Sequence, residues 1–167
     1  MASGGGSKSK EKTVLVAIDP SEHSMRAFNW YLEHFYRSDQ IIGLAHIYTH
    51  PEHHEFGRRH GNALEGIECQ QHDEDVKKVE QDHVELVKKY EEICKAKGLR
   101  YREFCMERKS SVGEAICDIA KENSGISCIV MGQRGHGAIK RALYGSVSEY
   151  VLHHAHTTVV IVPPEKK

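Results

Sequence analysis

No apolar run in this chain of 167 residues approaches the roughly 18 residues that a membrane-spanning helix needs. Residues 1–12 also lack the apolar centre of a secretory signal peptide. The formal net charge is only -1, so the chain has no overall basic field of the kind that favours nucleic-acid binding. We therefore expect a cytoplasmic protein that binds neither a membrane nor nucleic acid.

Several familiar catalytic and metal-binding patterns are missing as well. The five cysteines are an odd number and include no Cys-x-x-Cys pair, which indicates reduced thiols rather than disulfides or a zinc site. There is no His-Glu-x-x-His motif, no Gly-Lys-Ser/Thr of a Walker A loop, and no convincing Ser-His-Asp arrangement. These absences leave no catalytic residue and no metal ligand that the sequence alone supports.

The chain is otherwise of ordinary globular composition, with 39% hydrophobic and 28% charged residues, and its length fits one domain. Runs of buried-strand character occupy residues 13–18, 41–47, 126–131 and 157–162, with a weaker run at 99–106. Helical spacing of apolar residues predicts helices at 21–36, 76–93, 111–123 and 146–156. Regular alternation of strands and helices predicts an α/β fold with a mostly parallel sheet and helices on both faces.

The composition also suggests where the domain begins and ends. Residues 1–11, which are rich in glycine and serine, are expected to form a disordered tail. The domain itself should span residues 12–164, followed by a short tail at 165–167. Within it, residues 48–70 are predicted to be a long, polar, histidine-rich loop.

A glycine-rich segment, residues 132–146, runs from the end of a predicted strand to the start of a predicted helix. Glycines let backbone amides approach an anion, and the unpaired amides of a helix N-terminus favour negative charge. Cationic side chains in the segment, such as Arg134, add local positive charge. The segment therefore predicts a phosphate site. The alternative is that Ser146-x-x-Glu149 is only a capping box and that the glycines only form a turn.

Asp19 follows the first predicted strand and precedes Pro20, a pattern typical of a helix N-cap with proline at the first helical position. A carboxylate at the end of such a strand can also hydrogen-bond a ribose hydroxyl. Both interpretations of Asp19 remain open, and they are compatible.

The histidine-rich stretch around His50, His53, His54 and His60 raises the hypothesis of a zinc or copper site. Such sites need about four ligands in fixed geometry, and the stretch lacks a spacing that provides them. A solvated loop is the simpler interpretation, and no metal site is predicted.

Three motifs together resemble the universal stress protein family. The spacing Gly132-x2-Gly135-x9-Gly145-Ser146 is similar to the nucleotide-binding signature of the family's ATP-binding branch. The strand end at Asp19-x-Ser21 and the strand closing at His46-Ile47 look like the corresponding parts of that family. The resemblance runs from about residue 12 to residue 162.

This resemblance implies a five-stranded, Rossmann-like sheet of order 3-2-1-4-5 that binds ATP together with Mg²⁺. Asp19 would contact the ribose or adenine side, Ala17 and Ile47 would line the adenine slot, and Met131 and Gly132 would lie near the ribose. The phosphates would be held by Arg134, Gly135, Gly145, Ser146, Val147 and Ser148.

The same strand order would place the last strand at a sheet edge, and an uncovered apolar edge invites pairing with another chain. The resemblance thus implies a homodimer joined through Val159, Val160, Ile161 and Val162. The function expected is that of an ATP-binding stress-response protein acting as a nucleotide-dependent binding module or switch. A slow ATPase or nucleotidyl-transfer enzyme, and a scaffold dimer that binds no nucleotide, are the alternatives.

Overall fold

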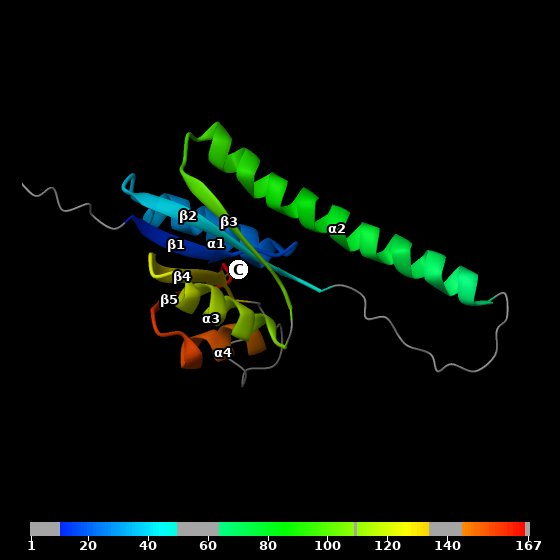
Figure 1. Cartoon of the computed structure of the whole chain (residues 1–167). Helices are drawn as coiled ribbons and strands as arrows, with labels where there is room; N and C mark the ends of the chain where they lie inside the picture. The colour runs from blue at the N-terminus through cyan, green and yellow to red at the C-terminus, as the bar shows by residue number, and fades with distance from the viewer. Residues whose placement is uncertain (1–10, 50–63, 109, 134–144, 166–167) are drawn as a thin grey trace, which may run out of the picture.

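The computed structural model describes residues 11–49, 64–108, 110–133 and 145–165, which form nine helices and strands (Figure 1). The strands are β1 (Lys12–Ala17), β2 (Gln40–Tyr48), β3 (Tyr101–Glu107), β4 (Ile126–Gly132) and β5 (Thr158–Val162). The helices are α1 (Glu22–His34), α2 (Leu64–Ala96), α3 (Val112–Glu122) and α4 (Ser146–His154).

The five strands form one sheet in the order β3-β2-β1-β4-β5, which confirms the predicted order. All four neighbouring pairs are parallel. The chain therefore builds outward from β1 to β3, then returns to the other side of β1 for β4 and β5. The strand order reverses between β1 and β4, the place where α/β sheets of this kind open a crevice for ligands.

Helices cover both faces of the sheet, as predicted (Figure 1). On one face, Val14 and Val16 pack with Phe28 of α1 and Tyr90 of α2. On the other face, the intervening Leu15 packs in a second cluster with residues of α3 and α4. Because successive side chains of β1 point to opposite faces and both faces are covered, the strand is apolar from Val14 to Ala17.

Helix α2 is longer than the helix predicted at residues 76–93, and its first turns lie within the segment predicted to be a loop. It begins at Leu64, so residues 64–70 are helical and the loop interpretation of 48–70 is wrong for them; Tyr48 belongs to β2. The helix ends where Gly98 adopts a left-handed φ of 63°, a conformation that suits glycine. Its 33 residues correspond to about 50 Å of helix, and its N-terminal part extends past the sheet (Figure 1).

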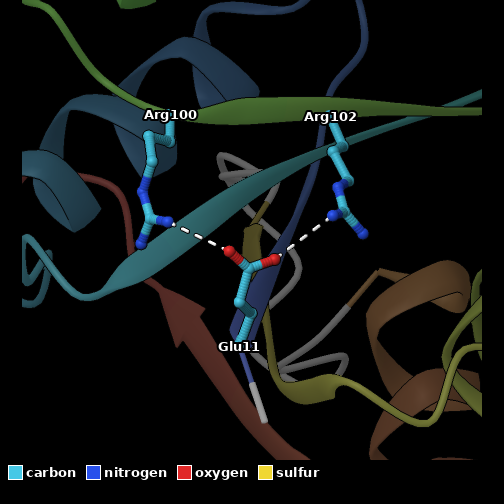
Figure 2. A network of polar contacts seen from close by, with 3 residues as sticks. All are labelled: Glu11, Arg100 and Arg102. Atoms are coloured by element: carbon cyan, nitrogen blue, oxygen red, sulfur yellow. Dashed lines mark hydrogen bonds and ion pairs between the residues drawn. The ribbon is translucent and has the colours of Figure 1, made fainter. Parts of the chain in front are cut away.

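The carboxylate of Glu11, which precedes β1, connects the start of the domain to the edge strand β3. Glu11 accepts hydrogen bonds from Arg100 and from Arg102 of β3, each over 3.2 Å, so one side chain reaches across β2 (Figure 2). All three side chains are at least half exposed. The pairing is accordingly worth little free energy, since water and salt screen exposed ion pairs.

Within the described residues, no helix is long and apolar enough to cross a membrane.

Gly132, at the end of β4, lies against the backbone of the first turn of α1. A Cβ atom at this position would stand 2.2 Å from the carbonyl oxygen of His23 and 2.6 Å from its carbonyl carbon. Neither backbone atom can move aside as the end of a flexible side chain could. The absence of a side chain at Gly132 therefore permits the close packing of β4 on α1.

We predict that Gly132→Ala lowers the free energy of unfolding by about 1–3 kcal/mol, the usual cost of inserting atoms into a packed interior. Chemical denaturation followed by circular dichroism measures it. Gly145→Ser is the matched control, because a Cβ at Gly145 would meet nothing closer than the Ser148 hydroxyl at 3.9 Å. Equal stability of Gly132→Ala and wild type would contradict the close packing of β4 on α1.

Candidate functional site

A cavity of about 480 Å³ opens at the carboxyl ends of β1, β2 and β4, on the side of the sheet covered by α3 and α4. It lies at the reversal of strand order between β1 and β4. The residues that line it are Ala17, Ile18, Asp19, Pro20, Ser21, His23, Ser24, Ala45, Ile47, Val112, Ile116, Met131, Gly132, Gly145, Ser146, Val147 and Ser148.

Most of the site residues named from the sequence meet around this cavity. Nine of them line it: Ala17, Asp19, Ile47, Met131, Gly132, Gly145, Ser146, Val147 and Ser148. The remaining two, Arg134 and Gly135, lie outside the described residues. The structure thus brings together positions up to 131 residues apart in the chain, although their contacts with a ligand stay a prediction.

The sequence analysis did not name eight of the lining residues as site residues: Ile18, Pro20, Ser21, His23, Ser24, Ala45, Val112 and Ile116. Four of them come from helices. His23 and Ser24 come from the first turn of α1, and Val112 and Ile116 come from α3. Helical periodicity could have placed Val112 and Ile116 on one face, since they are four residues apart. It could not have shown that this face borders the strand ends, because that depends on how α3 packs on the sheet.

The cavity is lined by both apolar and polar groups. The apolar ones include Ala17, Ala45 and Ile47 from the strands and Ile116 from α3. Asp19, Ser21 and the start of α4 supply polar groups. This combination suits a ligand with an apolar part and a strongly polar part.

The β1–α1 loop is held by a chain of hydrogen bonds that begins at Asp19. Its Oδ1 atom accepts hydrogen bonds from the backbone N–H of Ser21 at 2.9 Å and from the Ser21 hydroxyl. The Ser21 Oγ atom in turn accepts from the N–H of Ser24, so Ser21 is the N-cap of α1. The interpretation of Asp19 as the N-cap is therefore wrong: Asp19 stands two residues earlier and orients the residue that caps.

The loop is also anchored to α2 by a buried hydroxyl pair. Ser24 Oγ accepts from the N–H of Asp19 at 3.0 Å and lies 2.8 Å from the hydroxyl of Tyr90. Tyr90 is 1% exposed, and burial raises the pKa of its phenol. A buried, neutral phenol thus fixes the distance between α2 and the cavity wall.

The start of α4 differs from the starts of α1 and α3. Those two helices are capped by the hydroxyls of Ser21 and Ser111, whereas the N-cap of α4 is Gly145, which has no side chain to accept from the first amides. The capping-box interpretation of Ser146 is wrong, because Ser146 is already the first helical residue and is exposed. The first amides of α4 therefore have no side-chain cap, and the partial positive charge of this helix end is offset only by Glu149 in the first turn.

A second contact between the cavity wall and α2 is made by two histidines. His46 Nδ1 lies 3.2 Å from the carbonyl oxygen of Ile18 and donates to it, since a carbonyl can only accept. The His46 ring stacks on the ring of His83 with centroids 5.0 Å apart. Burial lowers the pKa of both imidazoles, and the proximity of His83 lowers that of His46 further. Both rings are favoured in the neutral form.

The described cysteines show no sign of an activated thiol. Burial raises the pKa of Cys94, Cys105, Cys117 and Cys128, to about 11 for Cys94 and Cys105. Thiols of this kind are protonated at neutral pH and react slowly. The histidines around position 54 lie outside the residues that the structure describes, so the metal hypothesis is not tested by it.

An open parallel sheet with a cavity at its reversal of strand order defines a class of α/β ligand-binding proteins. Within that class, a model of the universal stress protein family matches residues 11–163. The chain belongs to the universal stress protein family.

Related sequences agree with this membership. The universal stress protein PHOS32 of Arabidopsis thaliana is 28% identical over 163 residues, covering 90% of this chain and 64% of PHOS32. The universal stress protein Slr1101 of Synechocystis is 45% identical over 53 residues, covering 32% of this chain and 48% of Slr1101. The chain thus spans between about half and two thirds of the lengths of these two relatives.

Solved structures share the fold at low sequence identity. The universal stress protein UspA from Lactobacillus plantarum has a TM-score of 0.63 and 18% identity, covering 92% of this chain and 98% of UspA. A family member from Arabidopsis thaliana with AMP bound has a TM-score of 0.60 and 18% identity, covering 92% of both chains. A universal stress protein in complex with cAMP has a TM-score of 0.53 and 19% identity, covering 92% of this chain and 98% of that one.

The His46–His83 stack predicts a loss of stability in mild acid. Because the folded state lowers the pKa of both imidazoles, the unfolded chain takes up protons first as the pH falls below about 6.5. Stability is therefore fully present at pH 7 and above, and decreases as the pH falls toward 5. The substitution His83→Leu places an apolar side chain against the rings of His46 and Tyr48 and removes one titratable group.

The free energy of unfolding, measured by urea denaturation between pH 7.5 and 5, should fall less steeply for His83→Leu than for wild type. His34→Leu, at an exposed histidine of α1, is the control and should follow the wild-type curve. Parallel curves for wild type and His83→Leu would show that the stacked pair does not set the acid sensitivity.

Proposed function

We propose that the cavity binds ATP and that the protein acts as a nucleotide-dependent binding module or switch. The single observation that carries this proposal is the pairing of an apolar slot with an uncapped helix N-terminus in one cavity. A base requires the former and a phosphate group the latter. The two solved relatives with AMP and cAMP bound support an adenine nucleotide as the ligand class.

In this arrangement the base packs between Ile47 and Ala17, Met131 and Gly132 lie near the ribose, and Asp19 faces the ribose or adenine side. Backbone amides of Gly145, Ser146, Val147 and Ser148 meet the phosphates, together with Arg134 and Gly135 from the preceding segment. These roles follow the family resemblance, and the positions of the nine described residues around the cavity support them.

The described lining residues suit a Mg²⁺ ion only as a companion of the phosphates. Asp19 is the one carboxylate among them, and one of its oxygens already accepts two hydrogen bonds from Ser21. Mg²⁺ commonly keeps several waters and binds through one or two carboxylates and phosphate oxygens. The ion would help to neutralise the phosphates, and Asp19 and the Ser146 hydroxyl are protein oxygens of the lining that would be able to hold it.

Binding is favoured over hydrolysis as the main activity. Among the described lining residues, the only carboxylate holds the Ser21 cap, and no second acidic group stands by to activate water or hold a metal. Slow ATP hydrolysis or nucleotidyl transfer, and a scaffold without nucleotide, remain the competing functions. The cytoplasmic location stays part of the proposal.

Gly145→Asp tests the phosphate position with opposite effects on stability and binding. An aspartate at the N-cap accepts from the first amides of α4, so we predict a ligand-free protein more stable by about 0.5–1 kcal/mol. The same carboxylate occupies and repels the phosphate position, so ATP should bind at least roughly tenfold more weakly. Thermal denaturation and isothermal titration calorimetry measure the two effects.

Gly145→Asn, which caps without charge, is the matched control and should weaken ATP less than Gly145→Asp. Unchanged ATP affinity in both variants would remove the α4 N-terminus from the site. Phosphate release above background by wild type, abolished in Gly145→Asp, would favour the enzyme alternative. A wild type that binds no nucleotide would favour the scaffold.

We further propose that the protein forms a homodimer through β5. This strand is at the edge of the sheet, and its side chains Val159, Val160 and Ile161 are only partly buried. Val162 differs: it is 3% exposed and packs in the core of its own protomer. Its side chain is therefore unavailable for the contact, and the first three residues carry the proposed interface.

Val160→Glu should convert the dimer to a monomer, because pairing would bury a charged side chain on the edge strand. Light scattering after size-exclusion chromatography measures the mass. Val84→Glu, at a valine of α2 that is 59% exposed, is the matched control and should leave the mass unchanged. A well-folded Val160→Glu protein that stays dimeric would place the interface elsewhere.

A further inference from the structure

His23 occupies a fixed place in the cavity wall. It lies in the first turn of α1, lines the cavity, and its backbone carbonyl packs against Gly132 at the end of β4. That contact joins two backbones, so it leaves the position of His23 little freedom. The residue therefore stands where the strand ends and the glycine-rich segment begins.

The side chain of Arg26, one helical turn later, determines which nitrogen of the His23 ring carries the hydrogen. Arg26 Nη1 lies 3.2 Å from His23 Nδ1, and its Nη2 donates to the carbonyl oxygen of Gln133 at 3.0 Å. A guanidinium group only donates hydrogen bonds, so Nδ1 must be the acceptor. In the neutral ring the hydrogen is then on Nε2, on the side of the ring away from Arg26.

The charge of Arg26 is not matched by a carboxylate in the described part of the chain, where its side chain makes no ion pair within 4.0 Å. Its Nε atom is buried without a hydrogen-bond partner there. Arg26 does not itself line the cavity, but its cation stands directly behind His23, which does, and the remaining N–H of the His23 imidazole is a donor. Both features favour an anionic oxygen in the cavity.

We propose that His23 is a specificity-determining residue that selects phosphorylated over unphosphorylated ligands, by donating a hydrogen bond from Nε2 to a phosphate oxygen. Arg26 is a positioning residue, which holds the ring in the tautomer that donates. The inference rests on the proposed nucleotide binding and adds to it residues outside the glycine-rich segment and the α4 N-terminus. Its ligand class is a nucleoside phosphate.

The test compares ATP with adenosine, which has the same base and sugar but no phosphate, by isothermal titration calorimetry. His23→Ala should weaken ATP binding roughly tenfold or more, as expected when a hydrogen bond to a charged group is lost, and leave adenosine binding unchanged within about twofold. His23→Gln keeps an N–H donor near the Nε2 position and should retain most of the ATP affinity. His34→Ala is the control on the same helix and should change neither affinity.

The role of Arg26 has its own readout. Long-range ¹H–¹⁵N spectra of the imidazoles should show His23 in the Nε2–H tautomer in wild type and in a mixture of tautomers in Arg26→Gln. The Arg26→Gln variant should also lose more affinity for ATP than for adenosine. Equal losses of ATP and adenosine binding in His23→Ala would make His23 merely structural and overturn the proposal. An unchanged ATP affinity in His23→Ala, in a protein whose wild type binds ATP, would overturn it as well. A wild type that binds neither ligand would overturn the proposed function itself.

Discussion

The approach of the β4 backbone to the α1 backbone at Gly132 is the constraint on which the site depends. With no side chain at Gly132, the end of β4 lies against the carbonyl group of His23, and the helix begins directly beside the strand end. This contact brings Asp19, Ser21 and His23 to the same cavity as Met131. A larger residue would separate strand from helix and widen the cavity before any ligand was involved. Gly132 variants therefore change folding stability as well as ligand binding. At Gly145 a Cβ atom would meet only the Ser148 hydroxyl at 3.9 Å, so variants there can weaken ligand binding without destabilising the fold.

Burial on both faces explains why the chain can place polar groups only at the strand ends. The central strands β1, β2 and β4 are covered by α1 and α2 on one face and by α3 and α4 on the other, so an unpaired polar side chain along their length would be costly. At the carboxyl ends of these strands a cavity opens, and Asp19 and the start of α4 both line it. The location of the candidate site is thus a consequence of the layered fold.

The fold was predictable because its signal is repeated along the chain. Continuous apolar strands such as residues 13–18 and the Ser111 cap of α3 each correspond to an observed element. The wrong predictions concern roles, such as helix capping, that several neighbouring residues could fill. Asp19, Ser21 and Ser24 all qualify as capping residues, and only the three-dimensional loop shows that Ser21 caps while Asp19 orients it. His23 escaped notice because its partners, Arg26 and Gly132, reach it through helix geometry and tertiary packing.

The wall of the cavity and helix α2 are mechanically connected through two buried polar contacts. Ser24, whose hydroxyl accepts from Asp19, also contacts Tyr90, and His46, which donates to Ile18, stacks on His83. Moving the β1–α1 loop without moving α2 would strand buried hydroxyl or imidazole groups, at a cost of about 1–3 kcal/mol for each. Any ligand that shifts this loop must therefore either shift α2 with it or bind more weakly by that amount. Because the N-terminal part of α2 extends past the sheet (Figure 1), a shift of α2 would also move this part of the helix.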